Sequence, residues 1–198
     1  MSTLLLASVS PSRRAILAAA GVVFTAEAPA VDEDAVKDSL KAEDATPAIV
    51  AETLAELKAR KVSLRHPDAF VIGADQVLDC EGAMYDKPRD VAAARRQLLA
   101  LRGRSHRLTA SVVVARGDAR IWHHTGVAVL HMRPFTDAFL DDYLTRVGET
   151  ACRSVGAYQL EGMGAQLFAR VEGDYFTILG LPLLPLLDFL RSHKLVKT

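Results

Sequence analysis

The sequence has few cysteines, no excess of charge and no long apolar run, and each of these absences argues against a class of protein. Its two cysteines, Cys80 and Cys152, lie far apart without metal-ligand spacing, so we expect free thiols in a reducing cytoplasm. Formal net charge is zero, from 24 basic and 24 acidic residues, whereas non-specific nucleic-acid binding needs a basic surplus. No apolar run approaches a membrane span. The N-terminus has no basic region before its short apolar run, so we expect no secretory signal.

Several motifs of catalysis and cofactor binding are absent as well. The sequence has no nucleophile elbow, Walker loop or dinucleotide fingerprint. Its six histidines form no i, i+4 pair on a predicted helix. His123 and His124 are adjacent on a predicted strand and therefore point to opposite faces. We do not expect a zinc site held by histidines.

The hydrophobic pattern alternates between the periods of strands and helices. Half of the residues are hydrophobic, and a chain of this length can bury a real core. Buried strands are predicted at 3–7 and 70–74, a short hairpin at 76–85 and two longer strands at 107–116 and 120–130. Helices are predicted from 11 and at 47–64, 90–101, 137–146 and 182–193. In the helix at 47–64, we expect Ile49, Val50, Leu54 and Leu57 to face inward. This order predicts a mixed α/β fold in one domain over residues 1–198.

The first candidate site lies where the first strand leads into a helix. Ser10 predicts an N-cap, and Pro11 predicts the first helical position. Arg13 and Arg14 follow in the first turn, where the helix already carries partial positive charge. Arginines, hydroxyls and free backbone N–H groups together suit an anion such as phosphate. The alternative is that both arginines are solvated surface groups.

Asp75 is the second candidate because it directly follows the apolar run 71–74. Ligands of open α/β sheets bind beyond the carboxyl ends of strands, and Ser8 and Asp75 would both lie at such ends. They could therefore face one cleft. A carboxylate there could hold a divalent metal, activate water, or do both. The alternative is an aspartate that caps a turn.

Three further charged residues are candidates with an ordinary alternative. Lys58, in the helix at 47–64, and Lys87, just past the hairpin, are point charges suited to phosphate oxygens. Either could instead be a surface lysine. Glu33 lies in the acidic run 31–34, which is also typical of a solvated loop.

A series of short segments from Leu4 to about Leu190 resembles, in order and spacing, the Maf family of nucleotide pyrophosphatases. They include Leu-Ala-Ser-x-Ser-Pro-x-Arg at the start, Ile-Gly-Ala-Asp ending at Asp75, and Gly-Leu-Pro-Leu from Gly180. The matching segments are 6–13, 31–33, 54–55 with 58–59, 72–75, 87–88, 103–106, 156–158, 161–164, 172–175 and 180–183.

The resemblance implies a fold, a reaction and roles for the candidates. The fold is a mixed, strongly twisted sheet with flanking helices, in two lobes around a central cleft, as in Maf and inosine triphosphatase proteins. The reaction is hydrolysis of a nucleoside triphosphate to monophosphate and pyrophosphate with Mg²⁺ or Mn²⁺, often by a homodimer, with no nucleic-acid or membrane partner. Carried over by motif, Asp75 is catalytic, Asp75 and Glu33 are metal ligands, and the phosphate- or substrate-binding residues are Ser8, Arg13, Lys58 and Lys87.

Three positions bear on the choice of nucleobase. Gln76 stands where many members have Thr, and Glu161 where many have Gln; both resemble the branch that acts on 7-methyl-GTP. A carboxylate at Glu161 could accept from N1–H and N2–H of the cationic base and balance its charge. Ser12 stands where that branch often has a Trp, and it cannot stack. We expect a preference for 7-methyl-GTP; the alternatives are a dTTP/UTP pyrophosphatase of the same family and a non-catalytic nucleotide-binding regulator of cell division.

Overall fold

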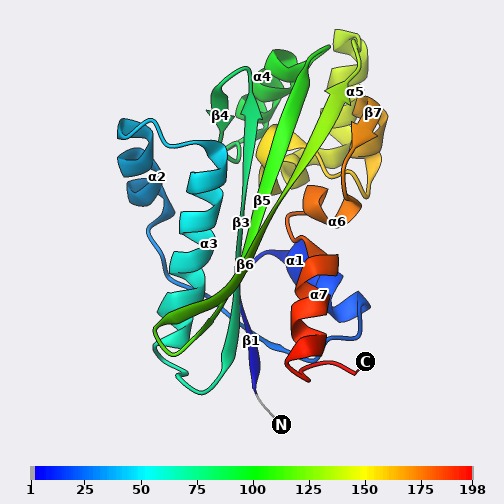
Figure 1. The fold of residues 1–198 in the computed structure, drawn as a ribbon. Coiled ribbons are helices and arrows are strands. Elements are labelled where there is room, and N and C mark those ends of the chain that lie inside the picture. Colours follow the sequence, from blue (N-terminus) through cyan, green and yellow to red (C-terminus); the bar gives the residue numbers. More distant parts are fainter. Residues whose placement is uncertain (1–2, 198) are drawn as a thin grey trace. The chain divides into compact units, whose positions relative to one another are not determined.

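The computed structural model describes residues 3–197, which form a seven-stranded mixed sheet flanked by helices (Figure 1). The strand order is β2-β1-β3-β5-β6-β7, and β4 pairs with β3. β1 is parallel to β2 and β3, whereas the pairs β3–β4 and β6–β7 are antiparallel. The strands are β1 (Leu4–Ala7), β2 (Thr25–Glu27), β3 (Phe70–Cys80), β4 (Ala83–Tyr85), β5 (Ser105–Arg116), β6 (Ala119–Met132) and β7 (Phe168–Glu172). The mixed α/β prediction is confirmed.

Side-chain caps and prolines fix where the helices begin. Ser10, Thr46, Asp90 and Thr136 each accept a hydrogen bond from a backbone N–H in the first turn, and proline occupies the start of the first and third helices. The helices are α1 (Pro11–Ala19), α2 (Glu33–Ala42), α3 (Pro47–Ser63), α4 (Val91–Leu101), α5 (Asp137–Val147), α6 (Tyr175–Ile178) and α7 (Leu183–Ser192). Within the described part of the chain, no helix is both long and apolar enough to span a membrane.

The chain forms two compact units, each assembled from separate stretches of sequence. Unit 1 draws its described residues from Met1–Gln76, Thr109–Gly126 and Asp174–Thr198, and unit 2 from Val77–Leu108 and Val127–Gly173. Strands β3, β5 and β6 contribute residues to both units.

The sheet of unit 1 is covered on both faces, as the alternation of a strand requires. Leu6 and Ile72 pack with residues of α1 and α7, whereas Leu5 and Val71 pack with Val62 of α3. Figure 1 shows α3 on one side of these strands and α1 and α7 on the other. Because both faces are buried, the sequences of these strands are continuous apolar runs.

Helix α3 lies unusually close to β3 because its inner face is made of small residues. Ala55 and Ala59 are fully buried against the strand, and a Cβ added to Gly73 would stand 2.2 Å from the Ala55 carbonyl oxygen and 2.6 Å from the Ala59 nitrogen. The expectation that Ile49 and Leu57 face inward is wrong, since they are 50% and 36% exposed. Val50 and Leu54 are buried as expected, because the helix turns its alanine stripe, and with it Lys58, toward the sheet.

Replacing Gly73 by Ala is expected to destabilise the protein by about 1–3 kcal/mol, since overpacking against backbone atoms cannot be relieved by a rotamer change. Urea unfolding measures the free energy. Gly162→Ala is the matched control, since its new Cβ would meet nothing nearer than 3.8 Å and its φ of −128° is negative. Equal effects of the two substitutions would contradict the close approach of α3.

Two local predictions need correction. The strand predicted at 70–74 continues as β3 to Cys80, so Asp75 lies inside a strand and not after its end. The reason is that β1 pairs with β3 only as far as Ala7–Gly73, after which β3 pairs with β4. The acidic run at 31–34 is the start of α2: Asp32 is its N-cap, and Glu33 is its first residue. Acidic residues are favoured there by the helix dipole.

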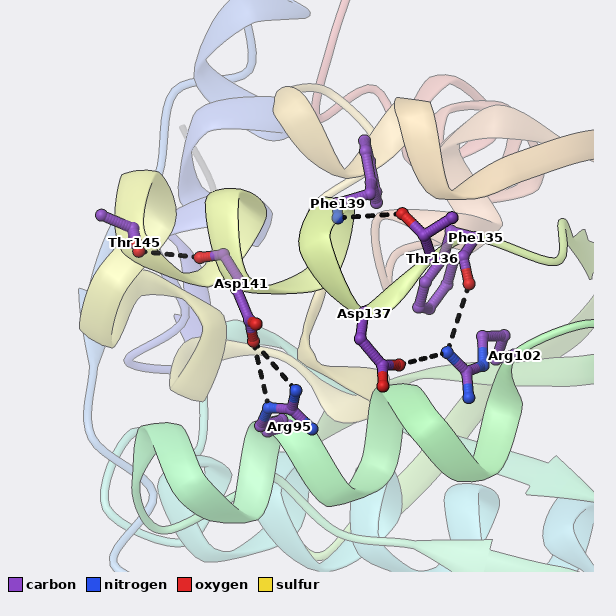
Figure 2. A network of polar contacts seen from close by, with 8 residues as sticks. All are labelled: Arg95, Arg102, Phe135, Thr136, Asp137, Phe139, Asp141 and Thr145. Atoms are coloured by element: carbon purple, nitrogen blue, oxygen red, sulfur yellow. Dashed lines mark hydrogen bonds and ion pairs between the residues drawn. The ribbon is translucent and has the colours of Figure 1, made fainter.

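Unit 2 contains α4 and α5, which are joined by polar contacts along their length (Figure 2). Arg95 donates to Asp141 at 2.9 Å, and Arg102 donates to both Asp137 at 2.6 Å and the Phe135 carbonyl at 3.2 Å. These ion pairs are exposed, so each adds little stability. Together they connect α4 to the first two turns of α5.

Candidate active site

A buried lysine joins two carboxylates in unit 1. Lys58 Nζ lies 2.7 Å from Asp75 Oδ1 and 2.8 Å from Glu33 Oε1. Lys58 and Asp75 are 5% and 6% exposed, whereas the Glu33 side chain is 40% exposed. Burying a charge is costly unless it is paired. The ion pair therefore accounts for how Lys58 and Asp75 can both be held in the interior.

The local sequence explains why these three residues meet. Asp75 has the same strand parity as Gly73, so it points to the face covered by α3. Lys58 stands on the alanine stripe of that helix, one residue before Ala59. Glu33 is brought to the pair as the first residue of α2, a helix that packs on α3. The structure thus brings together three of the residues predicted from sequence.

Arg13 lies in the same unit, in the first turn of α1. Its Nε donates to the Gly180 carbonyl at 2.8 Å. Burial lowers the pKa of the guanidinium, and the negative charges of Asp75 and Glu33 oppose that shift. Arginine stays protonated in proteins, so Arg13 and Lys58 are two fixed cations near two carboxylates.

The serines at the start of the chain support the turn into α1. The Oγ of buried Ser8 accepts from the Ser10 N–H at 3.1 Å, and the Ser8 carbonyl accepts from Arg14 Nε and Nη2 at 3.2 and 3.0 Å. Arg14 is thus anchored on the backbone. Ser12 is half-buried in the first turn of the helix.

Gln76 and its neighbour Asp75 point to opposite faces of the sheet. Alternation along β3 directs Gln76 to the other face of the sheet, where its Nε2 donates to the carbonyls of Thr177 and Ile178. Gln76 therefore contacts the segment that leads to Gly180, the residue whose carbonyl accepts the hydrogen bond from Arg13.

Lys87 and Glu161 belong to unit 2, and both are exposed. Lys87 follows β4, and Glu161 lies in the glycine-rich loop at 156–164. The packing of the loop against β3 and against itself accounts for two of its glycines. A Cβ on Gly156 would come within 2.6 Å of Leu78, and one on Gly164 within 2.4 Å of the Gln159 carbonyl oxygen. These two glycines are thus required by the chain's own fold.

Buried aromatic contacts hold the base of this loop. His106 Nε2 and Tyr158 Oη are 2.7 Å apart, and Tyr143 Oη donates to the Ala157 carbonyl at 3.1 Å. Burial lowers the pKa of His106 to about 4, so its ring is neutral at pH 7. A neutral ring has one donor and one acceptor nitrogen, which makes it a structural partner for Tyr158. The loop that presents Glu161 is therefore built on buried, hydrogen-bonded aromatic side chains.

Sequence reasoning missed the carbonyl of Gly180 and the backbone of Thr177 as parts of the site. Backbone acceptors leave no residue-type signal. The available signal was Gly180 itself, because its φ of +90° suits only glycine and marks a tight turn. The Asp174-x-x-Thr177 spacing is a second signal, since Asp174 caps α6.

Comparison with known proteins gives a consistent answer across the chain. Residues 3–193 match the family described as "Maf-like protein". A "Nucleoside triphosphate pyrophosphatase" of Paramagnetospirillum magneticum is 60% identical over 96% of this chain and 97% of its own length. A relative with the same description in Granulibacter bethesdensis is 54% identical over 96% and 97%. A "7-methyl-GTP pyrophosphatase" of Rhizobium meliloti is 52% identical over 96% and 95%.

Proposed function

Because this chain belongs to the Maf family, we propose that it hydrolyses 7-methyl-GTP in preference to other nucleoside triphosphates, using a divalent cation. In coarser terms the protein is a nucleoside triphosphate pyrophosphatase, a hydrolase that acts on acid anhydrides. The observation that carries the hydrolytic part of the proposal is the Lys58 ammonium held between Glu33 and Asp75, with Arg13 in the same unit.

The residues of this cluster have the properties that pyrophosphate release requires. Arg13 and Lys58 are fixed cations that can bind the triphosphate and stabilise the charge that develops on its oxygens. Asp75 accepts the proton of the attacking water, a role that needs a positioned carboxylate. Ser8 directly follows Ala7, the last β1 residue paired with β3, and we assign its hydroxyl to the binding of the nucleotide.

The donor set fits Mg²⁺ or Mn²⁺. Two carboxylate oxygens lie within 2.8 Å of the same ammonium nitrogen, and Mg²⁺ is typically held by one or two carboxylates together with substrate phosphates and water. Among the described residues, no group of three or more His, Cys, Asp or Glu could hold a metal by itself. Glu33 and Asp75 would hold the ion jointly with the nucleotide. When bound, the ion neutralises charge on the phosphoryl oxygens.

The purified protein is expected to release pyrophosphate, and not orthophosphate, from a nucleoside triphosphate in a metal-dependent reaction. The measurement is a colorimetric phosphate assay run with and without added inorganic pyrophosphatase, across canonical and methylated nucleotides. Colour should appear only when the coupling enzyme is present, and EDTA should remove it. Orthophosphate without the coupling enzyme, or no product from any nucleotide, would refute the pyrophosphatase reaction.

The wild-type enzyme should prefer 7-methyl-GTP over dTTP and UTP, and Glu161→Gln should reduce that preference by about ten- to a hundred-fold. A hydrogen bond to a charged group is worth about 1.5–3 kcal/mol, and about 1.4 kcal/mol corresponds to one decade. Catalytic efficiencies on 7-methyl-GTP, GTP, dTTP and UTP are compared side by side. Glu81→Gln, at an exposed glutamate of the same unit paired with Arg104, is the control. A wild-type preference for dTTP or UTP would refute the proposed preference for 7-methyl-GTP, but it would leave the pyrophosphatase reaction standing.

The relatives described as 7-methyl-GTP pyrophosphatases support this choice of base. Ser12 offers no stacking surface, so we assign the discrimination between nucleobases to the negative charge of Glu161. Gln76 is the remaining position that differs between the two branches. Its contacts point to a different contribution.

A further inference from the structure

Both N–H donors of the Gln76 amide are committed to backbone carbonyls. Its Nε2 donates to Thr177 at 2.9 Å and to Ile178 at 3.0 Å. A primary amide has only two such donors. If these N–H groups donated to a nucleobase, their hydrogen bonds to the Thr177 and Ile178 carbonyls would first have to break. The amide is instead bound to the last residues of α6.

The same segment also holds Arg13. The Gly180 N–H donates to the Thr177 carbonyl at 3.0 Å, so Gln76 and Gly180 share one acceptor. The Gly180 carbonyl in turn accepts from Arg13 Nε at 2.8 Å. A Cβ added to Gly180 would lie 3.5 Å from Arg13 Nη2 and 3.6 Å from Gln76 Oε1. Arg13 and Gln76 therefore pack on the same glycine from two different elements.

The turn has a further anchor that does not involve Gln76. Asp174 Oδ2 accepts from the Thr177 N–H at 2.7 Å and from Thr177 Oγ1 at 2.9 Å. Thr177 is 2% exposed, and a Cβ on Gly126 would stand 2.7 Å from its Oγ1. Removing the Gln76 amide should therefore loosen the turn relative to β3 without unfolding it.

We propose that Gln76 is a positioning residue for Arg13. Through the Thr177 carbonyl it fixes the turn at 177–180, and the Gly180 carbonyl then fixes the direction of the guanidinium. This inference rests on the proposed function, in which Arg13 binds the triphosphate. Because phosphates are common to all nucleotides, Gln76 sets the strength of phosphate binding and leaves the choice of base to other residues.

The direct test uses inorganic pyrophosphate, a ligand that has phosphates and no base. Gln76→Met keeps the length of the side chain and removes its hydrogen bonds. Calorimetry should show pyrophosphate binding weakened about tenfold, which corresponds to about 1.4 kcal/mol. Catalytic efficiency should fall by a similar factor on 7-methyl-GTP and on UTP, so that their ratio changes less than twofold. Unchanged pyrophosphate affinity, or a ratio that shifts more than threefold, would overturn the proposal.

A double-mutant cycle tests whether the effect passes through the arginine. In an Arg13→Ala background, Gln76→Met should lower pyrophosphate affinity by less than twofold further, because coupled residues are non-additive. A full tenfold effect without Arg13 would also overturn the proposal. Circular dichroism checks folding, and the shorter Gln76→Thr replaces the Met variant if that variant does not fold. The binding cycle needs no turnover, so failure of pyrophosphate release by the wild type would be recognised separately.

Discussion

Replacing Asp75 by Asn is expected to lower turnover by about 10²–10⁴-fold, the range for loss of a positioned acid–base group, while the protein remains folded. The amide has the same shape, and its oxygen can still accept from Lys58, which now lies 2.7 Å from Oδ1. What disappears is the negative charge that accepts a proton and shares the metal. Turnover is followed as pyrophosphate release, and circular dichroism verifies the fold.

Asp118→Asn is the matched control for this substitution. Asp118 also accepts a hydrogen bond from a cation of α3, Arg60, but its side chain is 61% exposed and lies apart from the buried cluster. Turnover of this variant should match that of the wild type. If Asp75→Asn keeps near-wild-type turnover, the role of proton acceptor moves elsewhere in the cluster, to Glu33.

Replacing Lys58 by Met is expected to lower the free energy of unfolding by about 3–5 kcal/mol, since removing one partner leaves Asp75 as an uncompensated buried charge. Lys61→Met is the control on the same helix, because Lys61 is exposed and its ammonium donates to a backbone carbonyl, that of Ala30. It should change stability by about 0.5 kcal/mol or less. Urea unfolding of both variants gives the comparison.

The double variant Lys58→Met with Asp75→Asn separates charge from packing. If the loss of stability arises from an unpaired carboxylate, the second substitution should recover much of it, because the charge is gone. Additive losses would instead show that the lysine acts through its packing on β3 alone. Mn²⁺ should also raise the melting temperature of Lys58→Met more than that of the wild type, because the ammonium no longer competes for the two carboxylates.

Patterns that depend on nearest neighbours were predictable from sequence. The run Leu4–Ala7 is a buried strand, and Ser10 with Pro11 opens α1, as local rules require. Pairing partners lie beyond such rules. Phe70–Ala74 looks like a complete strand, and only its later pairing with β4 extends it through Asp75 to Cys80. The inward face of α3 was wrongly predicted at Ile49 and Leu57 because a stripe of alanines gives little hydrophobic signal. The same stripe lets the helix approach β3 closely.

The candidate site was predictable as a set of residue types and much less as a set of contacts. Glu33, Lys58 and Asp75 could be selected as charged residues within family-like segments. Their convergence depends on strand parity at Asp75 and on the helix that begins at Glu33, which the acidic composition of that run obscured. Side chains that bind backbone carbonyls, as Gln76 does, cannot be assigned from residue type, because their partners could be any residue.

The anchoring of Arg13 on Gly180 joins two segments that are 167 residues apart in the sequence. The acceptor of Arg13, the α7 residues that pack with α1, and the capped turn all lie after residue 173, so they are made well after Arg13. Chains are synthesised at about 5–20 residues per second, so the 167 residues that separate Arg13 from Gly180 take roughly 8–33 seconds to make. A nascent or C-terminally clipped chain would lack this support. The Arg13 anchor therefore forms only in chains that have been translated beyond Gly180.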